Sequence, residues 1–301
     1  MKLAITGATG FVGGRLLRLA VRQGHEVTAL TRRSQEERAG VTWVQGALDN
    51  RQALQRLVEQ ADAIIHVAGV INAPDAAGFE AGNVTGTLAV LAAATATGVH
   101  RFVHVSSLAA REPSLSLYGA SKRKAEELVE RSGLDWAIVR PPAVYGPGDR
   151  ETLELFKAAR LGFVPLPPKG RLSLIHADDL SRLLLALADP AAPSQLLVEA
   201  DDGREGGWSH REFAQALATA QSRRAMALSV PAGIIRMGAK LDGLLRRDKA
   251  KLTSDRAAYF CHPDWTIDPA RRPSADLWRP EVETATGLKD TADWYCRNGW
   301  L

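Results

Sequence analysis

Short strand-like runs alternate with helical patterns from the first residues to residue 140. The runs rich in Val, Ile and other β-formers are 2–6, 26–30, 42–45, 63–67, 102–106 and 136–140. The helical patterns between them are 11–23, 52–60, 83–97 and 118–131. Short apolar runs are typical of parallel strands covered on both faces, and their alternation with helices predicts an α/β fold. We therefore expect a doubly wound parallel sheet that binds ligands beyond the carboxyl ends of its strands.

A glycine-rich turn joins the first strand run to the first helical pattern. Glycines permit a tight turn and a close approach of backbone N–H groups to a pyrophosphate, and the N-terminus of the helix adds partial positive charge. A glycine pattern between a strand and a helix therefore predicts a dinucleotide site. The residues of this turn that we assign to the site are Gly7, Thr9, Gly10, Phe11, Val12 and Gly13.

Tyr118 and Lys122 lie four residues apart on a predicted helix, so their side chains share one face. An adjacent ammonium favours the phenolate form of a tyrosine, which otherwise has a pKa near 10. Tyr118 would then donate a proton to a carbonyl or remove one from an alcohol. Ser107, at the end of a strand run, would orient and polarise the same oxygen. We predict these three residues as the catalytic group.

The spacing Gly-x-x-Gly-x-x-Gly resembles that of the extended short-chain dehydrogenase/reductases, the NAD-dependent epimerase/dehydratase-like enzymes. The other motifs that carry this resemblance are His66-Val67-Ala68-Gly69, Asn83-Val84-x-Gly86-Thr87, Tyr118-x-x-x-Lys122, Arg140-Pro141 with Tyr145-Gly146-Pro147, and Ile175-His176-x-Asp178-Asp179. The resemblance implies a Rossmann-like fold in which Lys122 also holds the nicotinamide ribose. It further implies cofactor contacts from Leu48, Ala68, Gly69, Val70, Asn83, Tyr118, Lys122, Pro141 and Val144.

The choice between NAD and NADP is expected directly after the second strand. An acidic side chain there would bind both ribose hydroxyls, whereas a basic one pairs with a 2′-phosphate. Thr31, Arg32 and Arg33 occupy this place. We expect NADP(H) as the preferred cofactor and keep NAD(H) as the alternative. Gly46-Ala47-Leu48 departs from the family's Gly-Asp-Leu, so adenine recognition is assigned to the Leu48 backbone.

The composition of the sequence changes after Pro141, where proline- and glycine-rich loops at 141–148 and 165–170 separate short elements. We expect a Rossmann domain at 1–162 that binds NADP(H), with 171–190 returning to it. A smaller, mostly C-terminal lobe for the substrate, at 163–301, would be interleaved with this domain and supply a lid.

Three functions are compatible with these motifs. The first is an oxidoreductase that transfers a hydride between NADP(H) and a carbonyl or alcohol. The second is a sugar-nucleotide epimerase, and the third is a non-catalytic NADP(H)-binding sensor or assembly protein. The presence of Ser107, Tyr118 and Lys122 favours an enzyme. Leu108 and Ala109 after Ser107 disfavour dehydration, because relatives that remove water resemble Thr-Asp-Glu at this point.

The expected substrate is small or apolar rather than a nucleotide-diphosphate sugar. Relatives that bind such sugars carry an Arg four places before the His of the Ile-His-x-Asp-Asp segment. Here Leu172 stands at that place and Arg171 lies one residue further back. Side chains alternate across a strand, so this shift points the guanidinium to the opposite face.

Other titratable residues are interpreted as structural. His66, His104 and His176 lack metal-ligand spacing, and no metal is expected. Asp178 and Asp179 begin a predicted helix and are expected to cap it.

The net charge of +4 decides little alone, but basic residues gather at 223–256. We interpret this segment as solvated helix faces or a lid, with a membrane contact as the alternative. The chain has two cysteines and no secretory signal at its start, so we expect a cytoplasmic protein. We expect a small-molecule substrate, no nucleic acid, no membrane span and a homodimer as the assembly to test.

Overall fold

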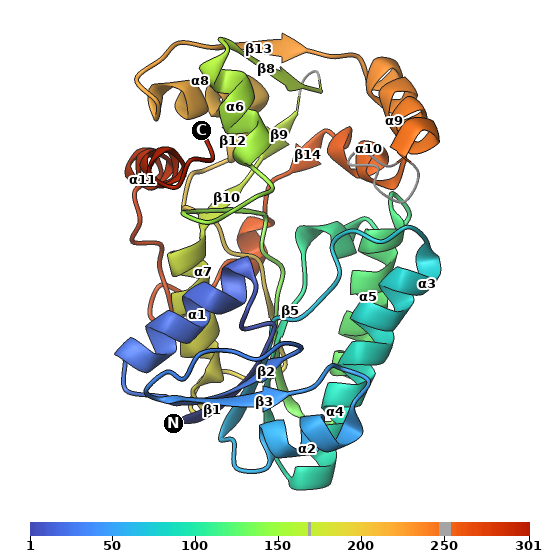
Figure 1. Ribbon diagram of the computed structural model, residues 1–301, viewed down its shortest axis with the longest axis vertical. Coiled ribbons are helices and arrows are strands. Elements are labelled where there is room, and N and C mark those ends of the chain that lie inside the picture. Colours follow the sequence, from blue (N-terminus) through green and yellow to red (C-terminus); the bar gives the residue numbers. More distant parts are fainter. Residues whose placement is uncertain (168–169, 247–253) are drawn as a thin grey trace. The chain divides into compact units, whose positions relative to one another are not determined.

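The computed structural model describes residues 1–167, 170–246 and 254–301 (Figure 1). The chain forms two compact units. Unit 1 comprises Met1–Pro141, Asp178–Glu199 and Arg271–Arg279. Unit 2 comprises Pro142–Ala177, Ala200–Ala270 and Pro280–Leu301.

The sequence predicts a first domain that ends at residue 162, whereas the first segment of unit 1 ends at Pro141. Residues 142–162 fall in unit 2 because β7 (Ala143–Tyr145) pairs with β10 (Leu174–His176) and because Phe156 of α6 (Leu153–Arg160) packs in the core of unit 2. The segment that returns to unit 1 begins at Asp178 rather than at residue 171.

Unit 1 is built on one seven-stranded sheet in which every neighbouring pair is parallel. In spatial order the strands are β11 (Leu196–Val198), β6 (Asp135–Val139), β5 (Arg101–Val105), β4 (Ala63–His66), β1 (Lys2–Thr6), β2 (Glu26–Thr31) and β3 (Val41–Gln45). The order reverses between β1 and β4, which is the switch point where doubly wound sheets bind ligands. The predicted α/β, doubly wound fold is confirmed.

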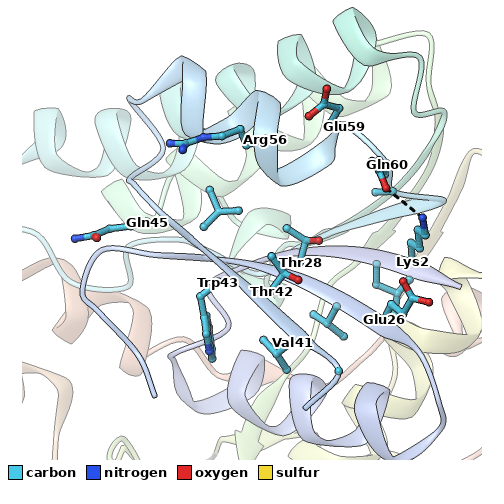
Figure 2. A pocket seen from close by; sticks show the side chains of 15 residues that line it. Lys2, Glu26, Thr28, Val41, Thr42, Trp43, Gln45, Arg56, Glu59 and Gln60 are labelled. Carbon is cyan, nitrogen blue, oxygen red and sulfur yellow. Dashed lines mark hydrogen bonds between the residues drawn. The ribbon is translucent and has the colours of Figure 1, made fainter. Parts of the chain in front are cut away.

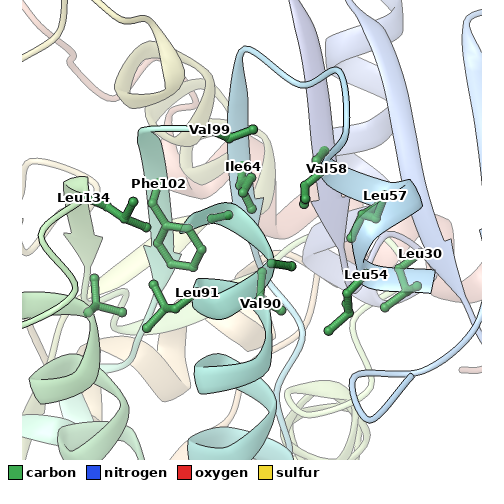
Figure 3. Packing of buried hydrophobic residues seen from close by; sticks show 14 of the residues in the cluster. Leu30, Leu54, Leu57, Val58, Ile64, Val90, Leu91, Val99, Phe102 and Leu134 are labelled. Atoms are coloured by element: carbon green, nitrogen blue, oxygen red, sulfur yellow. The ribbon is translucent and has the colours of Figure 1, made fainter. Parts of the chain in front are cut away.

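Helices cover both faces of this sheet (Figure 1). On one face lie α2 (Arg51–Val58), α4 (Gly86–Thr97) and α5 (Leu117–Glu130), and on the other lie α1 (Phe11–Arg22) and α7 (Ala177–Ala188). Figure 3 shows the first of these layers, where Leu54 of α2 and Leu91 of α4 pack among sheet residues such as Ile64 and Phe102. These side chains are nearly inaccessible to water.

The helical pattern predicted at 83–97 begins earlier and changes type. α3 (Ala76–Phe79) runs into a π-helical turn, η1 (Glu80–Thr85), which continues as α4. A π turn inserts an extra residue and often marks a functional site. Here it carries Asn83, which is buried. Gly98 ends α4 with a left-handed conformation, φ 74°.

The described residues of unit 2 form three small sheets and a core of their own. Its remaining strands are β8 (Phe163–Leu166), β9 (Arg171–Leu172), β12 (Trp208–Ser209), β13 (Met226–Ser229) and β14 (Asp264–Trp265). Its helices are α6 (Leu153–Arg160), α8 (His210–Thr219), α9 (Ala232–Arg246), α10 (Ser254–Phe260) and α11 (Thr284–Arg297). Phe156, Phe213 and Tyr295 meet in the main core.

Short 3₁₀ turns complete the chain at η2 (Leu108–Arg111) and η4 (Pro269–Arg271). Within the described ranges, no helix is both long and apolar enough to cross a bilayer. Of the basic segment singled out at 223–256, Arg247, Lys249 and Lys251 lie outside the described residues.

Candidate active site

The glycine turn after β1 is tightly closed. Gly7 has φ +73°, a conformation that favours glycine, and its carbonyl accepts a hydrogen bond of 3.0 Å from Gly10 N–H. A Cβ on Gly13 would lie 2.1 Å from Gly7 O, so the helix and the turn touch through backbone alone. Gly10 caps α1 without a side-chain hydrogen bond. This cradle fits a pyrophosphate, because a helix N-terminus free of its own cap attracts anionic groups.

A second loop, Ala68-Gly69-Val70 after β4, closes against the glycine turn and against α5. A Cβ on Gly7 would lie 2.7 Å from Ala68 N. Asn83 holds the loop by two hydrogen bonds: Val70 N–H donates to Oδ1 at 2.7 Å and Nδ2 donates to Val70 O at 2.9 Å. A Cβ on Gly69 would lie 3.0 Å from Asn83 Oδ1 and 3.7 Å from Lys122 Nζ. The structure thus brings predicted cofactor residues next to Lys122.

The residues after β2 form a compact turn with exposed arginines. Thr31 Oγ1 donates to Arg33 O at 2.7 Å, and Thr31 itself is buried. Arg32 and Arg33 are exposed, and neither forms an ion pair with any part of the chain that the structure describes. Two unpaired guanidiniums at the carboxyl end of β2 make this turn attractive for an anionic group.

The other residues assigned to the cofactor lie on separate elements. Leu48 contacts the start of α4, since a Cβ on Gly86 would lie 2.6 Å from its Cδ1. Pro141 is buried at the end of the first segment of unit 1, and its carbonyl accepts a hydrogen bond of 3.1 Å from Leu108 N–H. Pro141 is therefore a neighbour of the Ser107 segment. Val144 lies on β7, in unit 2.

Tyr118 is the second residue of α5, in the first turn of the helix. Ser116 caps this helix, and its Oγ accepts a hydrogen bond of 2.9 Å from Gly119 N–H. The half-buried Tyr118 ring lies 6.1 Å from the Phe79 ring, centroid to centroid. A Cβ on Gly119 would lie 2.6 Å from Ala109 O, so the start of α5 packs directly on η2, which Ser107 caps.

Lys122 is buried one turn after Tyr118. Its Nζ donates to Val105 O, at the end of β5, at 2.8 Å. Burial lowers the pKa of Lys122 to about 8, and the negative charge of Glu126 partly offsets this effect. Lys122 therefore loses its proton near pH 8. While it is protonated, its positive charge would stabilise a phenolate on a neighbouring side chain.

Ser107 follows β5 and is buried. Its Oγ accepts a hydrogen bond of 3.2 Å from Ala109 N–H. That bond uses one lone pair of the hydroxyl and leaves its proton to be donated elsewhere. Ser107, Tyr118 and Lys122 thus all lie at the carboxyl end of β5 or on the helix that packs there, in unit 1.

Sequence reasoning assigned no role to Glu126, one turn beyond Lys122. This buried carboxylate accepts hydrogen bonds from Ser106 Oγ at 2.5 Å and from Arg140 Nη2 at 2.7 Å. Its four-residue spacing from Lys122 on a helix was the signal that could have found it. Ser121 was also missed, and its Oγ lies 2.8 Å from Asn83 Nδ2.

Two histidines near the site, His66 and His104, are buried and neutral. His66 Nδ1 lies 2.7 Å from Thr6 Oγ1, and its Nε2 lies 3.0 Å from Thr87 Oγ1. Burial lowers the pKa of His66 to about 3 and lowers that of His104 well below its usual value. His66 therefore has the structural role predicted for it. His176 packs edge-on against Tyr145, with ring centroids 5.3 Å apart.

Asp178 and Asp179 lie at the start of a helix, as predicted, and their capping role stays a prediction. α7 begins at Ala177, so both residues lie inside its first turn rather than before it. Carboxylates there still favour the positive end of the helix dipole. Asp178 pairs with Arg15 of α1 at 3.2 Å, and Asp179 pairs with Arg182. Among the described residues, no group of three His, Cys, Asp or Glu side chains has the arrangement of a metal site.

A hollow of about 620 Å³ lies elsewhere in unit 1, between the first residues of β1 and β2, the whole of β3 and the end of α2 (Figure 2). Thr28, Thr42, Arg56 and Glu59 contribute to its lining. It contains none of the residues predicted to bind the cofactor or to act in catalysis. Ligands of doubly wound sheets bind at the opposite ends of the strands, so this hollow is separate from the candidate active site.

Comparison with known proteins identifies the family. The model of the NAD dependent epimerase/dehydratase family matches residues 3–195. The chain is 39% identical, over 99% of its length and 96% of the relative, to a ceramide reductase from Caulobacter vibrioides. It is 31% identical, over 96% and 98%, to a 2-alkyl-3-oxoalkanoate reductase from Stenotrophomonas maltophilia. The solved structure of MoeE5 in complex with UDP-glucose and NAD matches with a TM-score of 0.76, covering 99% of each chain at 20% identity.

The family match covers more than half of the chain, and the relatives cover nearly all of it. The resemblance read from the sequence motifs is confirmed. The chain belongs to the NAD-dependent epimerase/dehydratase family and is an NAD(P)-dependent oxidoreductase of the extended short-chain dehydrogenase/reductase type.

Proposed function

We propose that this chain reduces the ketone group of a long-chain, apolar substrate with NADP(H). The observation that carries the proposal is the buried Lys122 ammonium, which lies one helical turn from Tyr118 and beside Gly69 and Asn83 of the predicted cofactor site. An ammonium in this place lowers the cost of a phenolate on Tyr118 as the tyrosine gives up its proton.

Each residue of the group has one task in the proposed reaction. When bound, the dinucleotide supplies the hydride. Ser107 Oγ–H donates a hydrogen bond to the substrate carbonyl oxygen and holds it towards Tyr118. Tyr118 Oη donates its proton to that oxygen as the oxygen becomes an alkoxide, and the Lys122 ammonium stabilises the phenolate that remains. Asn83 keeps Gly69 and Val70 in place against Lys122.

An apolar substrate is supported by the relatives and by the surroundings of Arg171. Both relatives named above are reductases, and a ceramide and a 2-alkyl-3-oxoalkanoate both carry alkyl chains. Arg171 donates to Gly206 O at 2.6 Å and to Gly207 O at 3.1 Å, so its guanidinium already binds backbone of unit 2. Leu172 packs against the unit 2 core. β9 therefore presents no arginine side chain that could bind a substrate diphosphate.

NADP(H) rather than NAD(H) is proposed because Arg32 and Arg33 stand where relatives selective for NAD carry an acid. A 2′-phosphate would form charge-assisted hydrogen bonds with these side chains, each stabilising by about 1.5 to 3 kcal/mol. The solved structure of MoeE5 contains NAD, so the proposed preference for NADP(H) rests on Arg32 and Arg33 of this chain and not on that structure.

A substrate screen with a matched variant tests the proposal. Oxidation of NADPH is followed with long-chain 3-oxo acids, 3-oxoceramide, UDP-glucose and UDP-N-acetylglucosamine, for the wild type and for Tyr118→Phe. We expect turnover with the long-chain ketones and a loss of about 10² to 10⁴ in Tyr118→Phe, since only the transferable proton is removed. Interconversion of a UDP-sugar without net oxidation of NADPH would instead establish an epimerase. NADPH binding with no reaction of any compound would favour the non-catalytic alternative.

A further inference from the structure

The two-stranded sheet formed by β8 and β13 has an apolar outer face. Its register places Met226 opposite Phe163 and Leu228 opposite Pro165, so these four side chains share one side. The alternate residues Val164 and Leu166 are buried in the unit 2 core. A sheet with one face in water normally alternates buried apolar with exposed polar residues. Here the four positions on the outer side, Phe163, Pro165, Met226 and Leu228, are apolar as well.

Segments next to the two strands in the sequence expose further large apolar side chains. Leu161 precedes β8, and Ile234 and Met237 lie three residues apart on α9, which follows β13 after Val230 and Pro231 (Figure 1). Ile235 and Ala239 of α9 are buried instead. The large exposed side chains of this surface are each at least 45% exposed, and they are Leu161, Phe163, Met226, Leu228, Ile234 and Met237. Exposed apolar residues gathered on one unit mark an interaction surface.

Arginines border this surface. Arg160 precedes β8, and Arg223 and Arg224 precede β13; because the two strands are parallel, all three lie at the same end of the sheet. They are exposed, and none forms an ion pair within the described ranges. Residues 213–241 include four basic and no acidic residues. The surface is therefore basic and apolar at once.

We propose that this surface, formed by β8, β13 and the start of α9, docks on an anionic lipid bilayer. Apolar side chains that enter the headgroup region, next to basic side chains that pair with lipid phosphates, are the combination that binds proteins to membrane interfaces. A second copy of the chain fits less well. A two-fold interface would bring two such basic patches together without acidic partners. This inference rests on the proposed function and adds to it: the surface of the bilayer is where the enzyme would meet an alkyl-chain ketone.

Vesicle co-sedimentation of the full chain, without substrate, tests the docking surface. The vesicles contain either phosphatidylcholine alone or equal parts of phosphatidylcholine and phosphatidylglycerol. We expect binding to the mixed vesicles that weakens with salt. Met226→Gln/Leu228→Gln should weaken partitioning by about tenfold or more, since two exposed apolar side chains no longer leave water. Arg223→Gln/Arg224→Gln should cause a similar loss with the mixed vesicles.

Matched controls lie on exposed positions of unit 1. Leu88→Gln removes an apolar side chain of similar exposure, and Arg22→Gln/Arg131→Gln removes two exposed charges. Both should bind vesicles like the wild type. Equal binding of Met226→Gln/Leu228→Gln and wild type, or no binding by the wild type, overturns the proposal. The proposal is also overturned if the wild type is a dimer that does not bind vesicles and the double variant Met226→Gln/Leu228→Gln is a monomer.

The failure of docking is distinguishable from that of the proposed function. A wild type that reduces a water-soluble ketone but binds no vesicles overturns docking alone. A chain that binds vesicles through these residues but reduces no ketone upholds docking and overturns the proposed reaction.

Discussion

Arg140, directly after β6, holds Glu126 of α5 through two charged hydrogen bonds. Arg140 Nε donates to Oε1 at 2.8 Å, and Nη2 donates to Oε2 at 2.7 Å. Both side chains are buried, and Glu199 lies 3.4 Å from Arg140 Nη1. Since Tyr118 and Lys122 precede Glu126 on the same helix, this pair fixes the helix that carries the proposed catalytic residues to the sheet.

Replacing Arg140 by Met leaves Glu126 and Glu199 buried with fewer cations. Loss of one partner of a buried ion pair costs about 3 to 5 kcal/mol, and we expect the free energy of unfolding to fall by this amount. Urea unfolding measures it. Lys157→Ala, which breaks an exposed pair with Glu154, is the control and should change the free energy of unfolding by less than about 1 kcal/mol. Similar losses in both variants would show that the buried pair does not stabilise the fold.

The cofactor preference depends on Arg32 and Arg33 after β2. We expect the wild type to bind NADPH more tightly than NADH. Arg32→Ala and Arg33→Ala should each weaken NADPH binding by about ten- to a hundredfold and leave NADH binding nearly unchanged, since only the 2′-phosphate contact is lost. Fluorescence titration of both cofactors provides the measurement. Arg38→Ala, at an exposed arginine later in the same loop, is the control. Equal affinities of the wild type for the two cofactors would refute the assignment.

The strands and helices between residues 2 and 140 could be predicted because short apolar runs alternate there with longer helical segments. Apart from the π-helical entry into α4, the expected bounds agree with the structure within two residues, as for 118–131 against Leu117–Glu130. β9, β12 and β14 were not predictable, because strands of two residues show no period. Their pairing comes from tertiary contacts, and so does the start of unit 2 at Pro142.

Some residues of the candidate site could be assigned from the sequence and others could not. Residues in local motifs, such as Gly7 or Lys122, could be assigned from spacing, and their roles stay predictions. Glu126 on α5 and Arg140 directly after β6 are fourteen residues apart in the sequence. Their contact depends on how α5 packs on the sheet, and no local pattern encodes that packing.

The pH dependence of turnover should reflect Lys122. Its pKa of about 8 is below the usual 10.5, so the ammonium that supports Tyr118 is lost as pH rises above about 8, and kcat/KM should fall there. Stability should move the other way. Between these two values the unfolded state binds more protons at Lys122, so its contribution to the free energy of unfolding increases with pH.

Rate profiles and urea unfolding over the same pH range separate these two effects. Lys122→Arg keeps its charge throughout and should shift the alkaline fall in kcat/KM to higher pH. Lys124→Met, at an exposed neighbour on α5, should not. An alkaline fall that persists unchanged in Lys122→Arg would assign it to another group.

Gly13 and Gly14 offer a paired test of the cradle at the start of α1. A methyl group on Gly13 would lie 2.1 Å from Gly7 O and 2.6 Å from Gly7 C, so the turn must open to admit it. A methyl group on Gly14 meets only ordinary contacts, 3.5 Å from Ala8 O and 3.7 Å from Arg18 Nη1. We expect Gly13→Ala to destabilise the fold by about 1 to 3 kcal/mol and to weaken NADPH binding by at least about tenfold. Gly14→Ala should retain NADPH affinity and gain up to about 1 kcal/mol, because Ala is the better helix former. Calorimetric titration and urea unfolding of both variants provide the measurements, and equal NADPH affinities of the two variants would show that the backbone contact between Gly7 and Gly13 does not shape the cofactor site.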